Sequence, residues 1–394
     1  MTQLVFVHGV ATRKGHAYDR TVANRDTLFR TVLFEDPQLA IRSPMWGDLV
    51  PPIPKAVYDT GGIATTFGLG AGAGMGGAGL GGAGLGGGIG GATGGGSTLT
   101  ISSLARSNPA AAIDALFADL IEQHNRRNEA IPAIELASFV AATRALSADL
   151  AAGDSQIAAD GARALFGHVT SDADLREALD RTGDGVASYG VASAIGGAIS
   201  AVTDRLRNIA SRAAVDPLVE LIRPEVGFFL GDVFAYLNDG GLRSGIRATI
   251  RADLIAAHGA RAPGEKMVVI GHSLGGVIVA DMLCNPQHAG LPADLGIDAL
   301  LTVGSQPGLF QALGLFGAPR AGGKTPRPAN VAAWFNVFDP LDPLAFACEP
   351  IFDGVKDMRF DSITGVASAH TTYFLRPQFY ARARRRLAEI GVIA

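Results

Sequence analysis

The hexapeptide GHSLGG, residues 271–276, constrains the fold of this chain more than any other segment. It follows the apolar run MVVI and precedes the helix-like run VIVADML, so the sequence predicts a strand, a sharp turn and a helix. A serine at such a turn has a strained backbone, and the residues two positions on either side must lack bulk, as Gly271 and Gly275 do. Ser273 is therefore a candidate nucleophile, and the Leu274 N–H in the first helical turn is a candidate oxyanion donor.

A structural alternative exists for this motif. The chain has 52 glycines among 394 residues, so GHSLGG could be an ordinary glycine-rich turn that happens to contain a serine. The apolar strand before it and the helix after it are the context that a nucleophile turn requires, and they favour the catalytic interpretation.

A neutral serine hydroxyl needs a general base, and the position along the chain separates the candidates. Of eight histidines, only His288 and His370 follow Ser273. His288 lies in NPQHAG directly after the predicted helix, where a turn or surface role is expected. His370 ends a loop of small residues and precedes a helix-like segment, Pro377–Ile390, which makes it the candidate base.

The acid is expected at the end of a strand between the serine and the base. The segment AAWFNVFDPLDPLA ends an apolar run with Asp339 and Asp342, each followed by a proline that favours a turn. Either aspartate could instead satisfy backbone N–H groups within that turn. We take Asp342 as the candidate acid and Asp339 as the alternative.

These residues resemble the α/β-hydrolase superfamily, and within it the lipase-like and esterase-like serine hydrolases. The opening LVFVHGV resembles an early strand of that family, after which a loop residue donates the second oxyanion N–H; Val10 and Ala11 are the matching positions. The resemblance gives His8 a structural role in this loop, makes the second aspartate of WFNVFDPLDPLA the catalytic one, and places a helix at GDVFAYL and GIRATIRADLIAA before the serine. It covers the first fifty residues and roughly the last 170.

Composition is that of a large, apolar globular protein, with 48% hydrophobic and 18% charged residues. The net charge of −4 gives no reason to expect a nucleic acid partner. Histidine spacing and the two separated cysteines, Cys284 and Cys348, give no metal-ligand pattern, so neither a metal nor another cofactor is expected. No basic, apolar leader is visible at Met1, so a cytoplasmic location is the default expectation.

The middle of the chain departs from this pattern. Residues 60–105 contain no charge, and residues 61–96 are almost entirely glycine and alanine. Such a segment is a flexible loop, a packed hydrophobic cap, or, through its GxxxG steps, a membrane-contacting segment. A second uncharged stretch, residues 185–203, has about the ~20 residues that span a bilayer, although it is poor in large apolar residues.

Helical spacing of apolar residues in NPAAAIDALFADLIEQHNRR, IPAIELASFVAATRALSADLAA and SDADLREALDRTG predicts a mainly helical insertion. We divide the chain into a first core part at residues 1–50, the insertion with its glycine-rich segment at 51–224, and a second core part at 225–394. The predicted strands are Leu4–Val7, Ile41–Trp46, Met267–Ile270, Ala299–Val303, Ala333–Val337 and a segment near Asp357–Asp361. Strands alternating with helices predict an α/β fold with a mainly parallel sheet and helices on both faces, here that of an α/β-hydrolase with a large helical insertion before the nucleophile strand.

The leading hypothesis is hydrolysis of a carboxylic ester, of a lipid or another acyl compound, through an acyl-enzyme, with Ser273, His370 and Asp342 as the triad. A second hypothesis is a membrane-associating effector or interaction protein, in which the insertion acts and the hydrolase core is a scaffold or is regulated. A silent binding module is disfavoured, because the Ser, Asp and His order is intact. The sequence does not identify a protein partner.

Overall fold

A computed structural model describes residues 2–51, 105, 109–151, 174, 231–238, 240–316, 323–360 and 369–394. Six parallel strands form one sheet in the order β2-β1-β3-β4-β6-β8. The strands are β1 (Thr2–Val7), β2 (Ala40–Arg42), β3 (Lys266–His272), β4 (Ala299–Val303), β6 (Trp334–Phe338) and β8 (Val355–Arg359). Two further short strands, β5 (Thr325–Pro326) and β7 (Phe352–Asp353), pair with each other.

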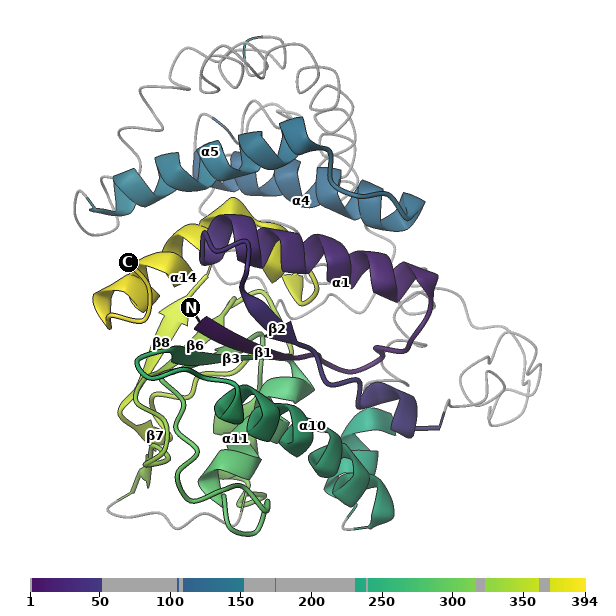
Figure 1. The fold of residues 1–394 in the computed structure, drawn as a ribbon, viewed down its shortest axis with the longest axis vertical. Helices are drawn as coiled ribbons and strands as arrows, with labels where there is room; N and C mark the ends of the chain where they lie inside the picture. The colour runs from purple at the N-terminus through teal and green to yellow at the C-terminus, as the bar shows by residue number, and fades with distance from the viewer. Residues whose placement is uncertain are drawn as a thin grey trace, which may run out of the picture.

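Helices cover both faces of the sheet, as predicted (Figure 1). On one face lie α1 (His16–Leu28), which continues into a π-helical turn at Phe29–Leu33, and α14 (Pro377–Glu389). On the other face lie α10 (Gly241–Gly259) and α11 (Leu274–Cys284). Two short helices, η2 (Gly47–Leu49) and α12 (Pro307–Ala312), and the 3₁₀ turn η3 (Tyr373–Leu375) complete the described core.

The apolar strands supply both faces of the sheet. In β1, Leu4 and Phe6 pack into the cluster on the α1 and α14 side, whereas Val5 and Val7 pack into the cluster on the α10 and α11 side. Because consecutive side chains of a strand point to opposite faces, a strand that is covered on both sides must be apolar throughout. This is why β1 contains the apolar run LVFV, β3 contains MVVI, and β4 is apolar except for the buried Thr302.

Strand bounds follow the sequence predictions closely, with two differences. The strand predicted at Ile41–Trp46 ends at Arg42, because Pro44 breaks the ladder and Trp46 turns into the core, where it is fully buried. The last strand begins at Val355 rather than near Asp357 and ends at Arg359. The middle strands agree within two residues at each end, and Ala299–Val303 agrees at both.

The described part of the predicted insertion consists mainly of two helices, α4 (Pro109–Arg127) and α5 (Ala133–Ala151). They form a further layer beyond α1 and α14 (Figure 1). Phe139 of α5 packs edge-on against Tyr380 of α14, with 5.6 Å between ring centroids, and Gln378 N–H donates to Asp114 of α4 at 2.9 Å. Burial raises the pKa of Asp114 to about 6. The helix predicted in SDADLREALDRTG, of which only Asp174 is described, otherwise lies outside the described residues, and the domain boundaries remain predictions.

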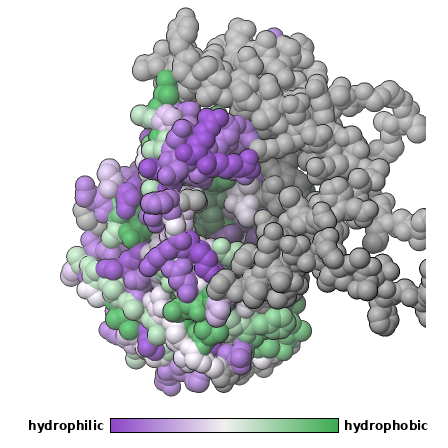
Figure 2. Space-filling view, turned by 90° about the vertical axis from the view of Figure 1, so that its right-hand side faces the viewer, coloured by the Kyte–Doolittle hydropathy of each residue, from purple (hydrophilic) through white to green (hydrophobic). Residues whose placement is uncertain are grey.

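Among the described residues, no helix combines the length and apolarity that crossing a bilayer requires. The predicted membrane-contacting stretches, residues 60–105 and 185–203, lie outside the described residues except for Ala105. On the face seen in Figure 2, hydrophobic and hydrophilic patches of the described residues lie next to each other.

The order of the strands creates a topological switch point between β1 and β3. From β1 the chain moves outward to β2 and later returns on the other side of β1 as β3. The loops that leave the carboxyl ends of β1 and β3 therefore diverge to opposite faces of the sheet, and such a switch point is where open parallel sheets bind ligands. The residues after Val7 and after His272 meet there.

A buried carboxylate ties α11 to α10. Asp281 of α11 is almost completely buried and accepts hydrogen bonds from the Tyr236 hydroxyl and from Arg247, and a longer one from Arg243 at 3.2 Å. Two guanidinium groups and a phenol thus compensate one buried negative charge.

We expect Asp281→Ala to lower the free energy of unfolding by about 3–5 kcal/mol, because Arg247 would be left without its buried partner. Urea unfolding followed by circular dichroism measures this loss. The control is Asp294→Ala, which removes a carboxylate whose side chain is 83% exposed and should change the free energy by less than about 0.5 kcal/mol. Equal effects of the two substitutions would contradict a structural role for Asp281.

Candidate active site

Ser273 occupies the turn between β3 and α11 with a backbone conformation that non-glycine residues rarely adopt. Its φ is 52° and its ψ is −129°, which costs of order 1–3 kcal/mol. Two hydrogen bonds hold it there. The Ser273 N–H donates to Val303 O at 3.0 Å, and the Ser305 hydroxyl donates to Ser273 O at 2.6 Å. Residues at and just after the end of β4 therefore bind both the N–H and the carbonyl oxygen of Ser273.

The glycines around this turn are required by the close approach of the backbone. A Cβ on Gly271 would lie 2.5 Å from Gly276 Cα, and one on Gly275 would lie 2.4 Å from the carbonyl oxygens of Val7 and His8. Such distances are far inside van der Waals contact, so α11 could not start so close to β3 with alanine at 271, or so close to β1 with alanine at 275. The predicted need for small residues at 271 and 275 is confirmed.

The structure brings the predicted nucleophile, base and acid together. His370 Nε2 lies 2.8 Å from Ser273 Oγ, and His370 Nδ1 lies 2.9 Å from Asp342 Oδ2 and 3.1 Å from Oδ1. An ionised carboxylate only accepts hydrogen bonds, so Nδ1 carries the proton and the Nε2 lone pair faces the serine hydroxyl. The Asp342 side chain is fully buried and that of His370 is 13% exposed, so the imidazole alone of this pair reaches solvent.

The two candidate acids have different surroundings. Asp342 contacts His370, whereas Asp339 Oδ1 accepts the Leu341 N–H at 2.8 Å within the turn after β6. Asp342 Oδ1 also accepts the Leu344 N–H at 2.9 Å, which fixes its carboxylate plane. Of the two aspartates, the structure places Asp342 beside the imidazole and gives Asp339 the turn role that was open for either.

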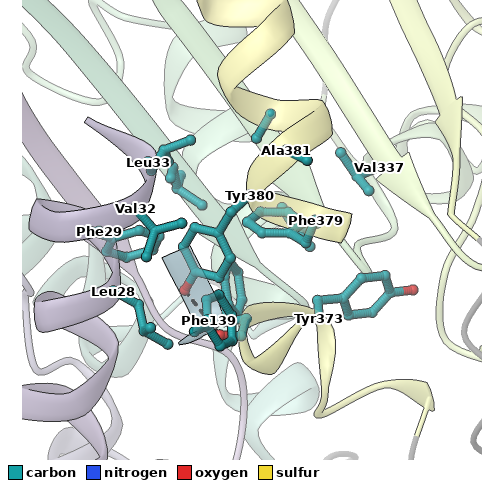
Figure 3. Close-up of a cluster of buried hydrophobic side chains, with 14 of the residues drawn as sticks. Leu28, Phe29, Val32, Leu33, Phe139, Val337, Tyr373, Phe379, Tyr380 and Ala381 are labelled. Carbon is teal, nitrogen blue, oxygen red and sulfur yellow. Dashed lines mark hydrogen bonds between the residues drawn. The ribbon is translucent and has the colours of Figure 1, made fainter. Parts of the chain in front are cut away.

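Tyr373 supports the acid, a role that no local motif indicates. Its hydroxyl donates to Asp342 Oδ2 at 2.9 Å and accepts the Asp339 N–H at 3.0 Å. Figure 3 shows the ring at the edge of the hydrophobic cluster formed with Tyr380 and Phe379, with the hydroxyl pointing away from the cluster. Burial and the neighbouring Asp342 charge raise the pKa of this phenol, so it remains a donor.

His272, next to the serine, holds the base from its backbone side. Its Nε2 lies 2.9 Å from His370 O, and the two rings lie 5.1 Å apart. Desolvation, with repulsion from His370, lowers the pKa of His272 to about 3. The ring therefore stays neutral at physiological pH and can donate to the carbonyl without adding charge next to Ser273.

The candidate oxyanion donors lie on both sides of the serine. Leu274 is the first residue of α11, where an N–H has no acceptor within the helix. Gly9 packs against the nucleophile, because a Cβ there would be 2.7 Å from Ser273 Cβ, and Val10 is the next residue of the loop. Ala11 N–H instead donates to Asp232 at 2.8 Å. Of the two predicted loop positions, Ala11 is thus committed elsewhere and Val10 is the remaining candidate.

His8 and Trp46 pack against each other next to this loop. The two rings stack with centroids 4.9 Å apart, and Trp46 Nε1 donates to His8 O at 3.0 Å. Burial lowers the pKa of His8 to about 4, so the stacked ring is neutral. His8 therefore supports the loop, as the resemblance implies, with its Nδ1 in hydrogen-bond distance of Gly9 O. Asp48, which follows, accepts the Lys14 N–H at 3.0 Å as a turn residue.

The other titratable candidates lie away from this constellation. His288 is exposed in the turn after α11. Cys284 and Cys348 are free thiols, and burial raises the pKa of each. In the part of the chain that the structure describes, no group of three or more histidine, cysteine or acidic side chains is placed to hold a metal ion.

No family model, curated protein or solved structure matches this chain. The geometry of Ser273, His370 and Asp342 therefore provides the argument for the chemistry of the site. A serine hydroxyl hydrogen-bonded to an imidazole that is oriented by a buried carboxylate is an arrangement for nucleophilic attack on an electrophilic carbon or phosphorus.

The lowered pKa of His272 predicts a pH dependence of stability. The unfolded chain binds a proton near pH 6.5 that the folded protein binds only near pH 3, so the stability contributed by the neutral ring is complete above pH 6.5 and is lost as the pH falls toward 3. The slope approaches about 1.4 kcal/mol per pH unit. The difference in free energy of unfolding between wild type and His272→Asn should therefore shrink between pH 6.5 and 4.5.

Urea titrations at several pH values measure this difference. His288→Asn, at an exposed histidine, is the matched control and should run parallel to the wild type. Parallel curves for His272→Asn as well would contradict the desolvation of the His272 ring.

Proposed function

We propose that this chain is a serine hydrolase of the α/β-hydrolase type that cleaves carboxylic esters through an acyl-enzyme. The observation that carries the proposal is the continuous hydrogen-bonded path from Ser273 Oγ through His370 to Asp342. The strained backbone of Ser273 at the end of a central parallel strand supports it. So does the chain order of serine, aspartate and histidine.

In the acylation step, Ser273 Oγ attacks the ester carbonyl carbon while His370 Nε2 takes the hydroxyl proton. The carbonyl π pair moves to the oxygen, and the N–H groups of Leu274 and Val10 stabilise the resulting negative charge. Collapse of this intermediate re-forms the carbonyl and expels the alkoxide, which takes the proton from His370. Asp342 holds the imidazole tautomer and stabilises the imidazolium between these transfers.

Deacylation repeats the sequence with water. His370 removes a proton from the water, the hydroxide adds to the acyl carbon, and the second intermediate releases the acid while Ser273 regains its proton. His370 therefore alternates between base and acid. His272 positions His370 through a contact with the His370 backbone carbonyl, and Tyr373 positions it through Asp342.

The preference for an acyl substrate rests on an exposed apolar side chain next to the acid. Leu341, which directly precedes Asp342, exposes 51% of its surface. Large apolar side chains left in water are typical of surfaces that bind apolar ligands. Thioesters, amides and acyl acceptors other than water use the same triad, so the substrate test includes them. The predicted action of the glycine-rich insertion on membranes remains a separate hypothesis.

A panel of p-nitrophenyl esters with acyl chains of two to twelve carbons tests the proposal, with a thioester and an anilide beside it. We expect ester hydrolysis with higher kcat/KM for the longer acyl chains. Ser273→Ala and His370→Ala should each lower kcat by about 10³-fold or more. Faster cleavage of the thioester or anilide would redirect the substrate class, and activity that survives Ser273→Ala would contradict the proposal.

The acid is tested by a matched pair of substitutions on one turn. Asp342→Asn should lower kcat by about 10³- to 10⁴-fold, because the amide no longer holds the productive imidazole tautomer. Asp339→Asn changes a buried aspartate whose Oδ1 accepts the Leu341 N–H within the turn, so kcat should stay within about tenfold. A larger loss for Asp339→Asn than for Asp342→Asn would reverse the assignment.

A further inference from the structure

The loop that follows β1 has a strained residue of its own. Ala11 has a φ of 56°, and a left-handed conformation costs an alanine of order 1–2 kcal/mol. No glycine relieves this position, so contacts from outside the loop must hold it. The loop also carries Val10, the proposed second oxyanion donor, one residue before the strained position.

One side of the loop rests on η2. A Cβ on Gly47 would lie 2.0 Å from Thr12 O, so the loop backbone packs directly on that glycine. Asp48 holds Lys14 at the outer end of the loop. These contacts fix residues 12–14, and none of them touches the Ala11 N–H.

Asp232 contacts the strained residue itself. Its Oδ2 accepts the Ala11 N–H at 2.8 Å, and its carboxylate also binds Arg13 through Oδ1 at 2.8 Å and Oδ2 at 3.3 Å. The Asp232 side chain is 1% exposed, and Arg13 compensates its charge from the solvent side, where 28% of the arginine side chain is accessible. Arg13 also donates to Thr12 O at 3.0 Å. Asp232 and Arg13 together therefore bridge residues 11–13.

The Ala11 N–H points at Asp232 and shares one rigid peptide plane with the Val10 carbonyl, so the hydrogen bond sets the Val10–Ala11 peptide plane. This restricts the rotation about ψ of Val10, which relates that plane to the Val10 N–H. An oxyanion donor that is held in place before the reaction costs no reorganisation when charge develops. A donor that is free to rotate stabilises the intermediate less.

We infer that Asp232 is a positioning residue for the oxyanion loop: by binding the Ala11 N–H and Arg13, it holds Val10 N–H toward the carbonyl oxygen that Ser273 attacks. The inference rests on the proposed function. It assigns Ala11, predicted as an alternative donor, to the support of the hole. The opposite arrangement, in which the Asp232 carboxylate blocks the hole, would make its removal activate the enzyme.

Asp232→Ala, Asp232→Asn and wild type are compared in two measurements on the full chain. Hydrogen exchange with mass spectrometry reports protection of the peptide that contains residues 9–13 and needs no turnover. Hydrolysis of a p-nitrophenyl ester gives kcat and KM separately. Asp48→Ala is the matched control, because it removes an aspartate that binds an N–H of the same loop outside the strained residue.

We expect exchange in the 9–13 peptide of Asp232→Ala to be at least about tenfold faster, with the β3 peptides unchanged. Its kcat should fall about 10- to 100-fold at nearly constant KM, part of the loss seen when an oxyanion donor is removed. Asp232→Asn keeps an oxygen acceptor for the Ala11 N–H, so its kcat should be much closer to that of wild type. If Asp232→Ala does not fold, Asp232→Asn provides the comparison with wild type. Asp48→Ala should keep kcat within about twofold.

Unchanged exchange in the 9–13 peptide overturns the inference, and so does a kcat that rises or stays within twofold of wild type in Asp232→Ala. An equal loss in Asp48→Ala also overturns it, because any perturbation of the loop would then suffice. If the wild type hydrolyses no ester, the proposed function fails and the positioning role fails with it. The exchange result still decides whether Asp232 holds the loop.

Discussion

The strained backbone of Ser273 is the constraint on which the rest of the site depends. A residue with φ of 52° between a buried strand and a buried helix must be held by its surroundings, since alone it would relax. The hydrogen bonds to Val303 and Ser305 at the end of β4 and the glycine contacts with β1 provide this. The serine hydroxyl thereby lies 2.8 Å from His370 Nε2 while its backbone stays packed.

The same sheet edge gathers the other groups. β1, β3 and β6 run parallel, so their carboxyl ends deliver the loop after Val7, the serine and the acid turn to one side. His370 comes from the segment that leads into α14. α14 is in turn held by α5, through Phe139 against Tyr380, and by α4, through Asp114 and the Gln378 N–H. The base is thus positioned by packing that reaches well beyond the site.

Much of this was predictable from sequence, because local signals carried it. GHSLGG between an apolar run and a helix specifies a turn that needs glycine at two positions, and the structure has both under backbone contact. The strands of a sheet covered on both faces appear as apolar runs. His370 and Asp342 followed from chain order and, for the choice of aspartate, from resemblance. The structure places both within hydrogen-bond reach of their expected neighbours.

The supporting groups could not be predicted, because each depends on a partner distant in sequence. Asp232 is 221 residues from Ala11, Tyr373 is 31 from Asp342, and Asp281 meets Tyr236 and Arg247 from two other segments. Neither the spacing of apolar residues nor a local motif indicates which distant residues will contact each other. The strand predicted at Ile41–Trp46 ends earlier, at Arg42, for a related reason: the Trp46 indole is buried in the core, where it stacks on His8.

The most direct test of an activated Ser273 is covalent labelling of the purified protein by a fluorophosphonate, with the adduct located by mass spectrometry. The probe requires a nucleophilic serine and does not depend on the identity of the natural substrate. We expect one adduct, on Ser273, that is absent from Ser273→Ala and strongly reduced in His370→Ala. A folded wild-type protein that takes no label, or an adduct on another serine such as Ser305, would contradict it.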